Sequence, residues 1–120
     1  MKGFFMKVTA VKYMLMAQNM DRAVEFYTSV FSFTLSFKSE FWTEMTFGDA
    51  IIALHGGGEG SLNKTGLSIQ TDNIEEFHNN CIDKGATENK APESRPGEPI
   101  VLSEIIDPEG NIISLTEYKG

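Results

Sequence analysis

The first half of the chain alternates apolar and polar positions in a way that predicts a strand, a helix and three more strands. Apolar side chains recur at helical spacing over residues 18–32, and Asn19 is the expected N-cap of that helix. Short runs rich in β-branched and aromatic residues predict strands, with a tight turn at Gly48-Asp49 between the last two. The expected strands are 8–17, 33–38, 41–47 and 50–55.

The second half repeats this order after the glycine-rich segment 56–66. A helix is expected over 73–85, where Asn73 caps the start, Glu76 completes a capping box and Gly85 ends the helix. The expected strands of this half are 67–71, 86–90, 100–106 and 112–118. Each half therefore reads as strand, helix and three strands.

Residue-level echoes between the halves indicate an internal duplication. A shift of 54 positions aligns Leu15 with Ile69 and Asn19 with Asn73, and a shift of 61 aligns the "IIAL" of 51–54 with the "IISL" of 112–115. We expect a single domain made of two modules, at about 7–56 and 65–118, linked by the glycine-rich loop.

Composition narrows the classes of function. The 120 residues are 41% hydrophobic, with a formal net charge of -7 and no cluster of Lys and Arg, which argues against nucleic-acid binding. No apolar run approaches the ~20 residues that a membrane span requires. Cys81 is the one cysteine, so no internal disulfide forms; this fits a cytoplasmic protein, and we expect the thiol to be inert on the apolar side of its helix.

Two motifs carry a family resemblance: "NMDRAVEFYTSVFSF" from Asn19, and "DPEGNIISLTE" from Asp107. With the doubled module, they resemble the vicinal oxygen chelate superfamily, which includes glyoxalase I, extradiol dioxygenases and bleomycin-resistance proteins. The resemblance implies an α+β fold of two βαβββ modules, whose curved half-barrel sheets enclose a cavity, and a homodimer. Whether the modules pair within one chain or between chains stays open.

In metal-using members, the resemblance implies four ligand positions, on the first and last strands of each module. They correspond here to Lys12, Gly66, Ala53 and Ser114. None of these side chains suits a divalent ion that prefers imidazole nitrogen and carboxylate oxygen. We therefore expect no metal and no cofactor, and open space where Ala53 and Ser114 replace a longer ligand.

Several residues are candidates for a ligand site in that cavity. His55 should share a strand face with Ala53, and an inward Lys12 would need a carboxylate partner. Strand alternation puts Trp42 and Glu44 on one face of 41–47 and Met45 and Phe47 on the other, and which face lines the cavity stays open. The expected ligand-binding residues are Lys12, Met14, Trp42, Ala53, His55 and Ser114. His78, on the second helix, is expected to pack while partly exposed.

These observations favour a metal-free protein that binds a small apolar or aromatic molecule. The alternative is a lyase, isomerase or dioxygenase with a non-standard metal site, or with acid–base chemistry by His55, Glu44 or Lys12. A regulatory module that binds another protein is a third possibility. The catalytic residues and the identity of the ligand stay open.

Overall fold

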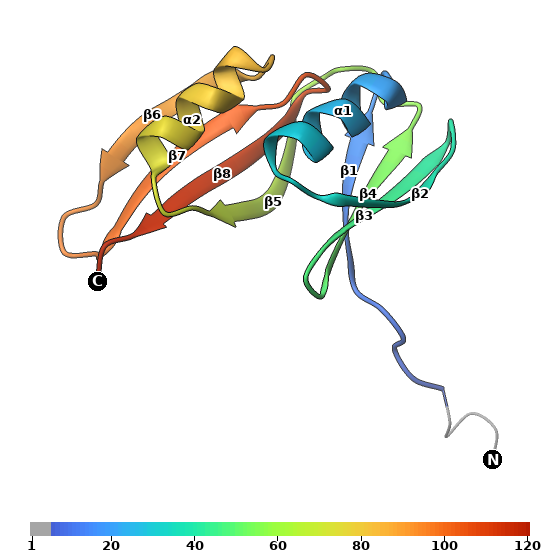
Figure 1. The fold of residues 1–120 in the computed structure, drawn as a ribbon, viewed down its shortest axis with the longest axis horizontal. Coiled ribbons are helices and arrows are strands. Elements are labelled where there is room, and N and C mark those ends of the chain that lie inside the picture. The colour runs from blue at the N-terminus through green and yellow to red at the C-terminus, as the bar shows by residue number, and fades with distance from the viewer. Residues whose placement is uncertain (1–5) are drawn as a thin grey trace.

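The computed structural model describes residues 6–120, and it confirms the predicted fold class and order of elements (Figure 1). The first module contains β1 (Lys12–Ala17), α1 (Met20–Val30), β2 (Thr34–Lys38), β3 (Trp42–Phe47) and β4 (Ala50–Gly56). The second contains β5 (Asn63–Gln70), α2 (Ile74–Asp83), β6 (Thr87–Ser94), β7 (Ile100–Ile106) and β8 (Asn111–Tyr118). They form separate four-stranded sheets, in the order β1-β4-β3-β2 and β5-β8-β7-β6.

Three strand boundaries differ from the prediction. Residues 8–11 are not a strand: the pairing of β1 with β4 begins with Lys12 opposite Ile51, and β4 starts at Ala50, so residues 8–10 have no partner on β4. The strand β5 starts earlier than expected, at Asn63. The strand β6 continues to Ser94 through Pro92, which is tolerated because β6 is an edge strand that pairs only with β7.

Strand register confirms that the two modules repeat one another. Met14 of β1 lies opposite Ala53 of β4, and Ser68 of β5 lies opposite Ser114 of β8. These pairs are related by the shifts seen in the sequence, since 14 plus 54 is 68 and 53 plus 61 is 114.

Both helices begin at their predicted caps. The Asn19 side chain accepts a hydrogen bond from Arg22 N at 3.0 Å, and that of Asn73 accepts one from Glu76 N at 3.2 Å. The chain leaves α2 through Gly85, whose φ of 117° favours glycine. Within the described part of the chain, neither helix has the length and apolar character needed to cross a membrane.

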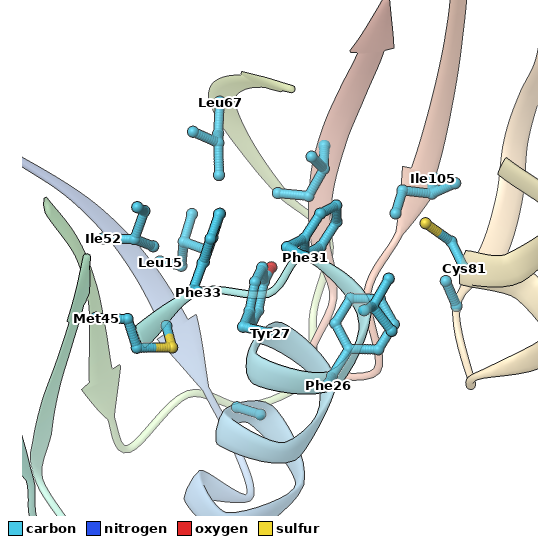
Figure 2. Packing of buried hydrophobic residues seen from close by; sticks show 14 of the residues in the cluster. Leu15, Phe26, Tyr27, Phe31, Phe33, Met45, Ile52, Leu67, Cys81 and Ile105 are labelled. Atoms are coloured by element: carbon cyan, nitrogen blue, oxygen red, sulfur yellow. The ribbon is translucent and has the colours of Figure 1, made fainter. Parts of the chain in front are cut away.

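The hydrophobic core runs without interruption from one module to the other (Figure 2). Phe31 stacks on Tyr27 and Phe33 of its own module, and its ring centroid lies 5.5 Å from that of Phe77 on α2. Burying such side chains stabilises the fold by roughly 1.5–3 kcal/mol each. The core takes up the helix-covered face of each sheet, so the opposite faces have no helix over them.

Glu109 joins the second module to the first. Its buried carboxylate accepts hydrogen bonds from Gln18 N at 2.9 Å, Asn19 N at 2.8 Å and Arg22 Nε at 2.7 Å. These donors lie at the start of α1, where the helix dipole also favours a negative charge. The turn between β7 and β8 thus caps a helix of the other module.

Asn111 and Asp107 complete this inter-module clamp. The Asn111 side chain accepts from Met16 N and donates to Met16 O, and Asp107 accepts from the Tyr27 hydroxyl at 2.5 Å. Burial raises the pKa of the Asp107 carboxyl despite the hydrogen bonds it accepts from Tyr27 and Asn111. Burial, with the nearby charge of Asp107, raises the pKa of Tyr27 well above its usual value. The sequence identified this segment as a turn, and the structure shows that it holds the modules together.

Candidate functional site

The uncovered face of the first sheet brings together most of the predicted site residues. Across the strands, Met14 lies opposite Ala53, and Ala53 lies opposite Glu44. The next row places His55 opposite Trp42. Because residues directly opposite one another share a face, these five side chains belong to one surface.

This pairing shows which residues of β3 lie on the uncovered face. Trp42 and Glu44 are partly exposed on the uncovered face, whereas Met45 is fully buried on the face that α1 covers. Phe47 shares the face of Met45, and its ring centroid lies 6.0 Å from that of Phe33. Of these four residues, Trp42 and Glu44 are therefore the two on the uncovered face.

Lys12, Glu44 and Trp42 form a fixed polar group on the uncovered face. Lys12 Nζ lies 2.7 Å from Glu44 Oε2, and Trp42 Nε1 donates to the same oxygen at 2.8 Å. Lys12 Nζ also lies 6.0 Å from the centroid of the Trp42 ring. The hydrogen bonds from Lys12 and then Trp42 lower the pKa of Glu44, so its carboxylate stays ionised near neutral pH.

His55 lies beside this group with one ring nitrogen engaged. Nδ1 is 2.6 Å from the carbonyl oxygen of Gly56, and the ring meets Trp42 edge-on at 6.1 Å between centroids. A carbonyl only accepts hydrogen bonds, so this contact requires a proton on Nδ1, and in the neutral ring Nε2 is then the acceptor. His55 is exposed, so Nε2 can be reached from solvent.

The prediction of open space at Ala53 is wrong. Ala53 is fully buried, although it lies on the uncovered face of the sheet. Its cross-strand neighbours Met14 and Glu44 carry longer side chains, which cover the short methyl group between them. Ala53 therefore lies beneath longer side chains on this face and leaves no open space.

Ser114 lies on the other sheet and does not join this group. It pairs with Ser68 and Glu104, and Glu104 accepts a hydrogen bond from Asn89 Nδ2 at 2.8 Å and lies 3.9 Å from Lys90 Nζ. The two sheets do not close on one another within the chain. The predicted cavity is thus two open faces, and the residues predicted for it are divided between them.

The residues at the family's four ligand positions do not fit a divalent metal. Lys12 is cationic, Ala53 and Gly66 have no donor side chain, and Ser114 offers a neutral hydroxyl. The nearby Glu44 carboxylate is already engaged by Lys12. Over residues 6–120, no three His, Cys, Asp or Glu side chains gather closely enough to hold a metal ion.

His78 is buried, which contradicts its predicted partial exposure. Its Nδ1 lies 2.9 Å from Ser103 Oγ and its Nε2 lies 2.8 Å from Glu88 Oε2. This Ser–His–Glu order resembles that of hydrolases, but Ser103 is completely buried, so a substrate cannot reach its hydroxyl. The group ties α2 to β6 and β7, a placement that only the folded sheet reveals.

Cys81 lies in the core of the second module, at the position that its helical spacing predicts. Burial raises the pKa of the Cys81 thiol to about 12. The thiol is therefore protonated near neutral pH and unreactive, as the sequence indicates.

A family model for the glyoxalase/bleomycin resistance protein/dioxygenase superfamily matches residues 9–115. The chain belongs to this superfamily. The match covers both modules, including the helix α1 and the clamp between β7 and β8 that carried the resemblance in sequence. No curated protein sequence matches the chain.

Several solved structures share the fold of this chain. A glyoxalase/bleomycin resistance protein/dioxygenase family enzyme from Burkholderia phytofirmans PsJN has a TM-score of 0.74 at 18% identity, covering 88% of this chain and 94% of that one. A bleomycin resistance determinant encoded on transposon Tn5 has a TM-score of 0.68 at 19% identity, over 94% and 100%. An integron cassette protein from the mobile metagenome of V. cholerae has a TM-score of 0.67 at 24% identity, over 96% and 99%.

Proposed function

We propose that this superfamily member binds a small apolar or aromatic molecule on the uncovered face of the first sheet, without a metal. The observation that carries the proposal is the group formed by Lys12, Glu44 and Trp42, where a family metal ligand would otherwise stand. Met14 and Phe37 are more than half exposed and flank this group with apolar surface.

The electrostatics of the group suit binding better than proton transfer by Glu44. Its carboxylate accepts hydrogen bonds from both Lys12 and Trp42, and its pKa is lowered. A group held ionised in this way is a poor general acid or base near neutral pH, where an effective pKa would lie close to 7. The pair instead provides a fixed polar floor that orients a ring stacked on Trp42.

Fluorescence tests the proposal directly, because Trp42 is the sole tryptophan of the chain. The full chain is titrated with the cation ethidium, the anion 1-anilinonaphthalene-8-sulfonate and neutral 2-naphthol, with calorimetry in parallel. We expect saturable quenching or a shift of Trp42 emission, with one bound probe per site. Lack of saturable binding for all three probes would refute the proposed aromatic site.

Metal analysis of the purified chain is the second arm of this test. If the site is metal-free, we expect no stoichiometric divalent ion in the purified chain. We also expect chelators to leave the binding of the probes unchanged. A stoichiometric ion that is lost in Glu44→Gln and His55→Gln would overturn the metal-free proposal. The variant Asp49→Asn is the control, since its exposed carboxylate lies in the turn between β3 and β4.

The hydrogen bond from His55 Nδ1 to Gly56 O supports a second candidate, acid–base catalysis by His55. The exposed Nε2 beside Trp42 can accept a proton from a molecule bound there. Product analysis of bound candidate substrates, followed by His55→Gln, separates the two functions. Turnover lost with binding retained supports the enzyme, and an absence of any turnover refutes this candidate.

A further inference from the structure

A pocket of about 570 Å³ lies between the two modules, on the helix-covered side of the first sheet. Its walls include Tyr13 of β1, residues 31–33 after α1, residues 67–71 of β5 and Phe77 of α2. The strands β1 and β5 are edge strands of separate sheets, so the pocket lies where two sheets approach without pairing. Its volume is within the range of roughly 300–1,000 Å³ that is typical of small-molecule sites.

A series of aromatic rings lines this pocket and ends at its surface. The ring centroid of Phe31 lies 5.5 Å from those of Phe33 and Phe77. The buried rings of Phe31 and Phe33 stand side by side (Figure 2), and the series continues from Phe33 to Phe47 at 6.0 Å. Phe47 is more than half exposed, and Tyr13 is about half exposed. A further planar ring placed against these two would extend the series at the roughly 4.5–7 Å spacing that aromatic pairs favour.

The charge of the lining restricts what the pocket can bind. Among the described residues that line it, none is charged, although Asp, Glu, Lys and Arg make up 22% of the chain. Its polar members are all neutral: Ser32, Ser68, Gln70 and Thr71. An ionised ligand would leave water and meet no counter-charge, which costs free energy, so the pocket favours a neutral molecule.

Uncharged hydrogen-bonding groups lie along one wall of the pocket. Within residues 6–120, β5 pairs only with β8, so alternate backbone N–H and C=O groups along its outer edge have no strand partner. The exposed Gln70 at the end of this strand adds an amide that both donates and accepts. A ligand with an uncharged polar group of its own can therefore be oriented here.

We propose that this pocket is a second binding site, which takes a neutral aromatic molecule carrying an uncharged hydrogen-bonding group such as an amide or a hydroxyl. The ring lies against Phe47 and Tyr13, and the polar group meets the edge of β5. Phe47 is on the face of the first sheet opposite to that of Trp42. The inference is therefore independent of the proposed function, and either site can fail its test without the other.

Two matched fluorescent probes test the preference for a neutral ligand. N-phenyl-1-naphthylamine is neutral, and 1-anilinonaphthalene-8-sulfonate is the same ring system with a sulfonate added. Both are titrated into the full chain and into Trp42→Leu, which lacks the ring of the other proposed site. In both proteins we expect one saturable site that binds the neutral probe at least about tenfold more tightly than the anion. Absence of this site in Trp42→Leu, or equal affinity for the two probes there, would overturn the proposal.

Adding a charge to the lining tests the cause of that preference. Gln70→Arg places a cation in the pocket, at an exposed residue where the fold tolerates the change. It should tighten binding of the anionic probe about threefold, as an exposed ion pair does, and so narrow the difference between the probes. An unchanged ratio of the two affinities would show that the uncharged lining is not what selects the ligand.

A pair of exposed phenylalanines tests where the neutral probe binds. Phe47→Ala removes the last ring of the series and should weaken its binding about tenfold. Phe41→Ala is the matched control, because Phe41 is similarly exposed but lines a different depression of the surface. Thermal unfolding of each variant checks that the fold is retained. Equal effects of the two substitutions would overturn the assignment of the pocket.

Varying the protein concentration distinguishes a small molecule from a second copy of the chain as the occupant. Sedimentation gives the state of association at each concentration, and the neutral probe is titrated at the same concentrations. We expect one probe per chain and an affinity that does not change with association. Loss of probe binding as copies of the chain associate would show that protein covers the pocket, and would overturn the proposal.

Discussion

The uncovered faces of the two sheets place different chemistry on one repeated backbone. One pair of residues facing each other across two strands corresponds in both sheets: Glu44 lies opposite Ala53 in the first, and Glu104 lies opposite Ser114 in the second. Both modules therefore hold a glutamate at the same place, each beside a lysine. Lys12 reaches Glu44 from β1, whereas Lys90 approaches Glu104 from β6 and at a longer distance.

The adjacent row differs more. Trp42 lies opposite His55 in the first sheet, and the corresponding pair in the second is Leu102 and Thr116. The first face can stack a ring and donate hydrogen bonds, while the second offers aliphatic surface and a hydroxyl. Repetition of the fold thus preserves the scaffold, while single side chains give the two uncovered faces different chemistry.

The hairpin turns differ as well. Glu109 in the β7–β8 turn reaches α1 of the first module, but the equivalent turn at Gly48-Asp49 is exposed and makes no such contact. The modules have the same topology, but only the turn of the second module makes hydrogen bonds to the helix of the other module.

The largest effect on stability is expected from removing the Glu109 contact between the modules. Glu109→Ala removes a buried carboxylate and orphans the N–H groups of Gln18 and Asn19, which should lower the free energy of unfolding by about 3 kcal/mol. Asp49→Ala, in the equivalent turn, should change it by less than about 0.5 kcal/mol. Urea denaturation measures the free energy of unfolding of both variants. Equal losses would show that Glu109 contributes no more to stability than Asp49 does.

Replacing His78 by its counterpart in the first module should have the next largest effect. By the shift of 54, that counterpart is Val24, so His78→Val makes the two helices alike at this position. It leaves the buried Ser103 hydroxyl without a partner and should cost about 2 kcal/mol in urea denaturation. The double variant His78→Val/Ser103→Val should recover part of this loss; if it recovers none, the polar pair does not explain the cost.

Exchanging the aromatic row tests the proposed site. Trp42→Leu gives the first sheet the residue of the second, and should weaken binding of an aromatic probe about tenfold by calorimetry. Leu102→Trp should leave the affinity unchanged, since Thr116 stands where the first sheet has His55. Unchanged affinity in Trp42→Leu would move the site away from this face.

The smallest effect concerns pH. Hydrogen bonds from Lys12 and Trp42 lower the pKa of Glu44 below its usual 4.5, so the stability it contributes is present above that pH and lost as pH falls through the lowered value. The difference in unfolding free energy between the wild type and Glu44→Gln should therefore be present at pH 7 and vanish at low pH. Because Asp107 is present in both proteins, its opposite shift cancels in this difference. A difference independent of pH would mean that the charge of Glu44 is not responsible.

Much of the fold follows from local patterns. Helical periodicity and the caps Asn19 and Asn73 located both helices, and two shifts of the sequence revealed the repeated module. Strand ends were harder to predict, because they depend on a partner: residues 8–11 look like a strand but meet none. The strand expected over 86–90 continues to Ser94 as β6, because Pro92 lies on an edge strand where its missing N–H costs nothing.

The sequence alone determined the repeat, the superfamily and the absence of suitable metal ligands at the four family positions, because each depends on residue type and spacing. Only the tertiary structure decided that Trp42 and Glu44 share a face with His55, that Ala53 is covered, and that His78 is buried against Ser103. These relations join residues from different strands and helices, and their geometry arises from register and packing, which no local pattern encodes.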